Sequence, residues 1–312
     1  MTTNGELRGI GLGHDALLYG SVDDYVGAIS SFVRGGRAGR EPVLVAVPHP
    51  KEELLREILD STRRVTFLDM ADLGRNPARI IPAVRRFVYA QSGRPTRFVG
   101  EPTWPGRSEA ELREVMLHES LLDTAMEGTA ISILCPYDTS ALSPAVIADC
   151  ERLHSYLVDH GERRASATFD PGLASTLFRT RLPPVPRHAE GMTFDHDLAQ
   201  LRQFVEERAG EVGLTGVRLQ DLLLAVNEVA TNSLVHAGPP GTIRLWHEPS
   251  AREVICDLCD DGHIAEPLVG RFGPYPLAQQ GWGLWMVNQV CDLVELRSGD
   301  WGTNVRLHVR IT

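Results

Sequence analysis

Lysine is almost missing from the 312 residues: Lys51 is the single one, and the other basic residues are arginine. A P-loop needs a lysine in the pattern G-x-x-x-x-G-K-[ST], but the residues before Lys51, Val47-Pro48-His49-Pro50, contain no glycine. The same scarcity leaves only Lys51 for Schiff-base chemistry or for the strand lysine of eukaryotic-type protein kinases, and Lys51 opens an expected helix. Any nucleotide site in this chain must therefore hold phosphate without lysine.

Cysteines and long apolar runs are also scarce. The five cysteines form an odd set, which is typical of reduced thiols rather than of a disulfide framework. Cys256 and Cys259 make a C-x-x-C, but within an expected strand they point to opposite faces, so packing is preferred over a metal or redox role. No apolar run approaches the ~20 residues of a membrane span, and residues 1–15 lack a signal-peptide pattern. We expect a cytoplasmic protein without membrane contact.

The charge balance is acidic, with a net charge of −10 from 41 acidic and 31 basic residues. Nucleic-acid-binding proteins hold phosphate with clustered cations, so this balance argues against direct nucleic-acid binding. The composition, 43% hydrophobic and 23% charged, is ordinary for a folded chain. The length favours two domains, each able to bury its own core.

The first half predicts a three-layer α/β domain with a mainly parallel sheet, because short apolar runs alternate with helical patterns from residue 41 to 159. The expected strands are 43–47, 65–68, 97–99 and 130–135. The expected helices are 51–60, 77–91, 108–126 and 143–158. Residues 161–191, rich in proline and arginine, read as a linker between a domain at 1–160 and a second domain at 192–312.

The second half predicts an α+β sandwich with an antiparallel sheet. Its expected helices are 196–209, 219–235 and 284–291, and its expected strands are 243–246, 253–258, 294–297 and 305–310. In the second of these helices Glu228, Asn232 and His236 recur every four residues and so share one face, while Leu222 and Val226 lie on the core-facing side. A solvated helix face would give the same polar stripe, so features farther along the chain must decide between the two interpretations.

Three downstream motifs favour a nucleotide site. Asp260, at a strand end, can accept a hydrogen bond from an exocyclic amine such as that of adenine, and Gly262 lets the base approach the backbone. Gly281-Trp282-Gly283-Leu284 begins a helix, whose free N–H groups hold phosphate without lysine. Gly302-Thr303 enters the last strand with a hydroxyl that can complete the pocket.

Taken in order, these motifs resemble the four nucleotide-binding boxes of the GHKL ATPase superfamily. Within it, the short length and the Asn232–Ala237 ending look most like the anti-sigma-factor serine kinases, including the actinobacterial regulators of general stress response. The resemblance implies ATP and Mg²⁺ as cofactors, with Asn232 as the Mg²⁺ ligand and Glu228 as general base. It implies that the remaining cofactor-binding residues are Asp260, Gly262, Gly281, Gly283, Leu284 and Thr303.

The first half resembles the MEDS domain, a ligand-sensing module with a RecA-like α/β core. The matching segments are His14–Tyr19, Gly100–Trp104 and Cys135–Asp138. Because parallel α/β sheets bind ligands beyond the carboxyl ends of their strands, a small-molecule pocket is expected there. The candidate sensory residues are His14, Tyr19, Trp104, Cys135, Tyr137 and Asp138; packing is the alternative role for each.

The two resemblances imply a cytoplasmic transcription regulator whose sensory half modulates an ATP-dependent anti-sigma-factor-like kinase. Such a protein binds a sigma factor, phosphorylates Ser or Thr of a STAS-type antagonist, or does both. The sequence leaves open whether the chain forms a homodimer. One alternative is a non-catalytic protein-binding module, gated by nucleotide or independent of it. Another is a two-component sensor histidine kinase, but the 36 positions between His196 and Asn232 leave no room for its helical hairpin and a complete ATP domain.

Overall fold

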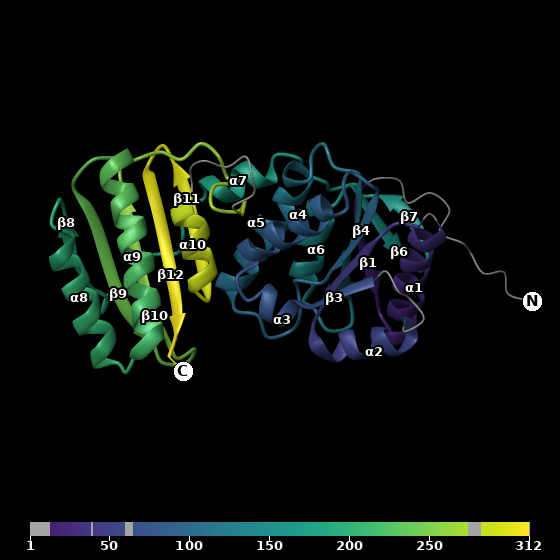
Figure 1. Cartoon of the computed structure of the whole chain (residues 1–312), viewed down its shortest axis with the longest axis horizontal. Helices are drawn as coiled ribbons and strands as arrows, with labels where there is room; N and C mark the ends of the chain where they lie inside the picture. The colour runs from purple at the N-terminus through teal and green to yellow at the C-terminus, as the bar shows by residue number, and fades with distance from the viewer. Residues whose placement is uncertain (1–12, 39, 60–64, 274–281, 312) are drawn as a thin grey trace, which may run out of the picture. The chain divides into compact units, whose positions relative to one another are not determined.

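The computed structural model describes residues 13–38, 40–59, 65–273 and 282–311. Two compact units divide between Leu173 and Ala174. Each unit has its own sheet and its own helices (Figure 1). No helix within the described ranges has both the length and the apolar composition that crossing a bilayer requires.

A seven-stranded sheet in the order β3-β2-β4-β5-β1-β6-β7 forms the centre of the first unit. All neighbouring strands are parallel except β6 and β7, which pair antiparallel. The strands are β1 (His14–Tyr19), β2 (Val43–Val47), β3 (Val65–Asp69), β4 (Thr96–Gly100), β5 (Ile131–Asp138), β6 (Tyr156–Asp159) and β7 (Glu162–Ala165). Strands β1 and β2 are buried along their whole length, as expected for a sheet covered on both faces.

Helices cover both faces of this sheet (Figure 1). Helices α1 and α2 pack on one face and contribute Tyr25, Ile29 and Leu55 to the apolar core, while α4, α5 and α6 lie on the other. The helices are α1 (Val22–Ala38), α2 (His49–Leu59), α3 (Met70–Leu73), η1 (Pro77–Arg79), α4 (Ile80–Ala90), α5 (Glu109–Ala125) and α6 (Pro144–Leu153). The predicted three-layer α/β fold is confirmed.

The start of α5 follows from its sequence. Ser108 accepts a hydrogen bond from the Glu111 backbone, and the Glu111 carboxylate accepts one from the Ser108 backbone, so the two form a capping box. This fixes the first turn of the helix that carries Glu119 into the interior of the unit.

Two expectations at the end of the first unit are wrong. The helix expected over 143–158 ends at Leu153, and the chain turns into strand β6. Residues 162–165, expected in a linker, form edge strand β7, where Arg163 pairs with buried Asp15 and stacks on Tyr156. Strand β7 has the sequence Glu-Arg-Arg-Ala and all four residues are exposed, so no alternation of apolar and polar residues marks it as a strand.

The second unit is a two-layer α+β sandwich, as predicted. Its antiparallel sheet has the order β11-β12-β10-β9-β8, and α8, α9 and α10 pack side by side on one face. The strands are β8 (Glu190–Phe194), β9 (Gly241–Glu248), β10 (Glu253–Asp260), β11 (Leu293–Gly299) and β12 (Gly302–Arg310). The helices are α7 (Leu173–Arg179), α8 (Leu198–Glu211), α9 (Gly216–His236) and α10 (Trp282–Val290). The largely exposed strand β8, at the sheet edge, is absent from the prediction.

Candidate functional site

A cavity of about 680 Å³ lies in the second unit and is lined by α9, the end of β10, the start of α10 and the start of β12. Its lining includes every described residue that the sequence assigned to the nucleotide site: Glu228, Asn232, Asp260, Gly262, Gly283, Leu284 and Thr303. The remaining one, Gly281, lies outside the described residues. Four separate chain segments thus converge on one space.

Helix α9 presents the polar stripe to this cavity. Leu222 and Val226 are buried on the side toward the sheet, whereas Glu228 and Asn232 are half-buried and line the cavity together with exposed His236. Glu228 and Asn232 are therefore not on a fully solvated helix face, and their role in a nucleotide site stays a prediction. A carboxylate and an amide one helical turn apart line the same open cavity.

Gly283, in the first turn of α10, lies directly against these two side chains. A Cβ atom placed on Gly283 would come within 2.6 Å of Glu228 Oε2 and 3.5 Å of Asn232 Nδ2. Residues of a helical first turn have backbone N–H groups without intrahelical partners. Glycine at this position lets the N-terminus of α10 lie close to the acidic and amide groups of α9, and a Cβ here would require the Glu228 carboxylate to move.

The opposite end of the cavity is fixed by hydrogen bonds around Asp260. Asp260 Oδ1 accepts the Gly262 N–H at 2.8 Å, and its Oδ2 has no hydrogen-bond partner in the part of the chain that the structure describes. Thr303 Oγ1 donates to the Gly262 carbonyl at 2.9 Å and lies 2.8 Å from Ser298 Oγ. Ser298 in turn accepts the Ile264 N–H at 2.8 Å. One carboxylate oxygen is thus held and the other is available to a ligand.

In the first unit, three of the candidate sensory residues come together. His14 Nε2 lies 3.3 Å from Cys135 Sγ, and the Tyr137 ring is 5.7 Å from the ring of His154. Burial first, and then the Glu119 carboxylate, raises the pKa of the Cys135 thiol well above its ordinary value. Sequence reasoning missed Glu119 and His154. Two features of the sequence could have pointed to these residues. Glu119 follows His118 on an expected helix, and His154 lies four residues after Cys150.

Tyr19 lies in a different group, at the carboxyl ends of β1 and β4. Tyr19 OH donates to Glu101 Oε1 at 2.9 Å, and Tyr25 OH donates to Glu101 Oε2 at 3.1 Å. The chain's single lysine, Lys51, pairs with the same carboxylate and donates to Tyr19. Burial raises the pKa of Glu101, with Lys51 acting in the opposite direction. Lys51 is thus occupied by a buried carboxylate.

The last two candidate sensory residues are Trp104 and Asp138, and Asp138 lies directly opposite Tyr19 in the parallel register of β1 and β5. Trp104 stacks under the Arg107 guanidinium, with 3.6 Å from the guanidinium carbon to the ring centroid. Asp138 Oδ1 accepts hydrogen bonds from the backbone and the hydroxyl of Ser140, which closes the turn after β5. The structure therefore divides the six candidates among several local environments.

Two family models match the chain, one in each of its two units. Residues 13–155 match the family model described as MEDS, the methanogen/methylotroph, DcmR sensory domain. Residues 194–309 match the model described as the histidine kinase-like ATPase domain. The chain joins a MEDS domain to a histidine kinase-like ATPase domain. Both domain resemblances drawn from the sequence motifs are confirmed.

A solved structure, described as the RsbU and RsbW domains of Rv1364c from Mycobacterium tuberculosis, is similar to part of the chain. The match covers 41% of this chain and 33% of that one, at 19% identity and a TM-score of 0.31. The chain thus spans about a third of the length of that relative. No curated protein matches the chain.

The ATPase cavity also has lining residues that the sequence motifs do not identify. They are Val229, His263, Ile264, Val269 and Val305, whereas Ser233, His236 and Ala237 belong to the Asn232–Ala237 segment already noted in the sequence. Ser298 is a further missed residue, since it holds both Thr303 and the Ile264 backbone. Its position just before the Gly299–Gly302 hairpin is the signal that was available.

The C-x-x-C of the ATPase domain is a packing feature. Cys256 is fully buried in β10, while Cys259, three residues on and so on the opposite face, contacts Asp257 and accepts a hydrogen bond from Asn304 at 3.2 Å. Burial, followed by the Asp257 carboxylate, raises the pKa of Cys259 to about 12. Because the two thiols lie on opposite faces of the sheet, they cannot bind one metal ion together or form a disulfide with each other.

Proposed function

We propose that the ATPase domain binds ATP with Mg²⁺ and acts as an anti-sigma-factor-like serine/threonine protein kinase, modulated by the MEDS domain. The observation that carries the proposal is the placement of Glu228 and Asn232 one helical turn apart in one cavity, with Gly283 packed against both. An acid–base group, an oxygen ligand and a helix N-terminus meet in one cavity, the set that phosphoryl transfer without a P-loop lysine requires.

The described residues fit ATP and Mg²⁺. Mg²⁺ takes oxygen ligands, usually one or two from the protein with the rest from phosphates and water, and the Asn232 side-chain oxygen supplies one. Bound Mg²⁺ would offset phosphate charge, a task for which the ATPase domain has no lysine. Gly283 leaves open the space that a Cβ would fill beside Glu228. The free Oδ2 of Asp260 can accept a hydrogen bond from the adenine amine.

Glu228 would act as the general base. A carboxylate takes the proton of an incoming serine or threonine hydroxyl when it lies within hydrogen-bond reach of that hydroxyl. Its place beside Gly283, at the start of the helix that would hold the phosphates, and one turn from Asn232 supports this role. Helix α9 would thus carry both Asn232, whose Mg²⁺ positions the phosphates, and Glu228, which accepts the proton.

The protein partners rest on the resemblance of the ATPase boxes to anti-sigma-factor serine kinases. On that basis the hydroxyl belongs to a STAS-type antagonist, and a sigma factor is the protein captured when the antagonist is phosphorylated. The residues ahead of α8 also favour this class over a sensor histidine kinase. They form α7 and β8, and β8 is the edge strand of the ATPase sheet, so His196 is not on a dimerising helical hairpin.

Asn232→Ala is expected to remove the rise in melting temperature that ATP with Mg²⁺ gives the unmodified chain. A ligand at 100 times its Kd stabilises the protein by about 2.7 kcal/mol, and this gain depends on the ion that Asn232 holds. The measurement is thermal unfolding of the full chain with ATP, with and without Mg²⁺. The control is Asn227→Ala, because Asn227 lies on the same helix but contacts Arg202 outside the cavity. An equal shift in the two variants contradicts the role of Asn232.

A further inference from the structure

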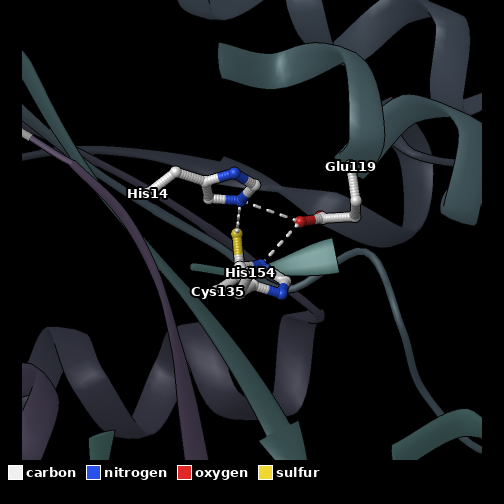
Figure 2. A group of neighbouring side chains, drawn as sticks. All are labelled: His14, Glu119, Cys135 and His154. Atoms are coloured by element: carbon white, nitrogen blue, oxygen red, sulfur yellow. Dashed lines mark hydrogen bonds and ion pairs between the residues drawn. The ribbon is translucent and has the colours of Figure 1, made fainter. Parts of the chain in front are cut away.

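Four side chains that bind metals in other proteins meet in the interior of the MEDS domain (Figure 2). They are His14 on β1, Glu119 on α5, Cys135 on β5 and His154 just after α6. None is more than 3% exposed. The two strands are parallel neighbours with Ala16 opposite Cys135, so His14 and Cys135 point to the same face of the sheet, the one covered by α5.

The donor atoms converge on one point. His14 Nε2 is 3.1 Å from Glu119 Oε2 and 3.3 Å from Cys135 Sγ, and His154 Nε2 is 3.3 Å from the same Glu119 oxygen (Figure 2). All four donor atoms lie within 4.8 Å of one another. With zinc bonds of about 2.0–2.3 Å, neighbouring ligands of a tetrahedral site are about 3.3–3.6 Å apart. The three separations of 3.1–3.3 Å are close to those edges, and the remaining pairs lie within 4.8 Å.

The outer nitrogens of both imidazoles face acceptors. His154 Nδ1 lies 2.9 Å from the Cys150 carbonyl oxygen, which only accepts, so this nitrogen carries the proton. His14 Nδ1 lies 3.5 Å from Asp123 Oδ1. Metal-binding histidines typically donate their second N–H to a carbonyl or carboxylate, which fixes the ring and turns the other nitrogen's lone pair toward the ion. His154 has this arrangement, while His14 Nδ1 faces the Asp123 carboxylate at ion-pair distance without a hydrogen bond in the described residues.

Hydrogen bonding alone leaves the cluster unsatisfied. With its proton on Nδ1, neutral His154 presents the lone pair of Nε2 to a carboxylate oxygen that also carries lone pairs. In the described residues this Nε2 and Glu119 Oε1 have no hydrogen-bond partner, although both are buried. A buried polar group without a partner costs free energy, and two facing lone pairs repel each other. A cation bound between His154 Nε2 and the Glu119 carboxylate would remove both costs.

We propose that His14, Glu119, Cys135 and His154 bind one Zn²⁺ ion. Mg²⁺ and Ca²⁺ prefer oxygen ligands, and this set has one carboxylate, whereas two imidazoles and a thiolate suit zinc. Binding displaces two protons, the one on the Cys135 thiol, which goes to solvent, and the one that His14 Nε2 donates to Glu119, which moves to Nδ1 or to solvent. Thiolate and carboxylate together then balance the charge of the ion, so the buried site is neutral. With four protein ligands, the ion ties β1 and β5 to α5 and to the end of α6.

The test uses the untagged full chain, reduced, stripped with a chelator and kept free of nucleotide. Co²⁺ is titrated in as a spectroscopic substitute for Zn²⁺. The expected result is one Co²⁺ per chain, with the intense visible bands of tetrahedral cobalt and a thiolate-to-cobalt charge-transfer band, all of which added Zn²⁺ displaces. A chain that shows no saturable cobalt spectrum overturns the proposal and leaves a proton as the shared cation.

Variants then test the ligand assignment. Cys135→Ala is expected to abolish the charge-transfer band, and His154→Gln to weaken Co²⁺ binding by more than about 100-fold, beyond the usual loss for a second-shell change. Cys150→Ala is the matched control, because Cys150 is also buried beside His154, and its carbonyl oxygen at 2.9 Å and Sγ at 3.9 Å both face His154 Nδ1 rather than the Nε2 that would bind the ion. A band that survives Cys135→Ala and vanishes with Cys150→Ala overturns the assignment. Since the unmodified chain already decides whether a site exists, a variant that fails to fold does not remove the test.

Discussion

Glu228→Gln is expected to slow phosphoryl transfer from ATP to a STAS-type antagonist by about 10²–10⁴-fold, the usual contribution of a general base. The amide has nearly the shape of the carboxylate and fits the same space beside Gly283, but it cannot take the hydroxyl proton. The ATP- and Mg²⁺-dependent rise in melting temperature should therefore persist. The measurement is single-turnover transfer of the labelled γ-phosphoryl group, with both proteins in excess over ATP.

The control for this variant is Glu206→Gln, which makes the same chemical change on the exposed side of α8. Transfer by that variant should equal transfer by the unmodified chain. If the unmodified chain and Glu228→Gln show the same absence of transfer while the antagonist or sigma factor still binds, the kinase proposal is wrong. The non-catalytic binding module then becomes the better description of the ATPase domain.

Gly302→Ala is expected to destabilise the ATPase sheet by about 3 kcal/mol or more, combining backbone strain with overpacking. Gly302 has φ of +108°, in the region that favours glycine, and begins β12. A Cβ there would lie 2.2 Å from the backbone oxygen of Asp260. Because the clash is with backbone, only movement of the end of β10 relieves it, and that movement displaces Asp260 from the cavity.

Hydrogen exchange, followed by mass spectrometry on peptides from β10 and β12, measures this loss within the full chain. It avoids treating a two-domain protein as a two-state system. Gly210→Ala is the control, since Gly210 is in helix α8 and a Cβ there meets nothing within 4 Å. That change should be neutral or slightly stabilising. Unchanged exchange in Gly302→Ala would show that β10 adapts without cost.

The ATPase site was largely predictable because each of its parts has a local signature. A four-residue period places Glu228 and Asn232 on one helix face, and the glycines mark places where backbones approach closely. What the sequence could not supply was the packing of Gly283 against Glu228, which depends on how α10 docks on α9. Ser298 was missed for the same reason, since its role arises only when β11 and β12 pair.

The buried cluster of the MEDS domain was only half predictable. His14 and Cys135 lie in motif segments, but their contact follows from the parallel register of β1 and β5, two strands separated by most of the domain. Glu119 reads as one more acidic residue on a helix, and His154 falls where the helical pattern of α6 continued too far in the prediction. No local period links these four positions, so only the fold brings them together.

Lys51 gives this protein a built-in reporter for chemical labelling. An amine-reactive reagent has one lysine side chain to modify in 312 residues, and that side chain is partly accessible at 29% exposure. Its ammonium is held by Glu101 and Tyr19, at the carboxyl ends of β4 and β1. The acylation rate of Lys51 therefore depends on whether this ion pair is intact. Labelling measured by mass spectrometry would follow the state of the MEDS domain with no engineered probe.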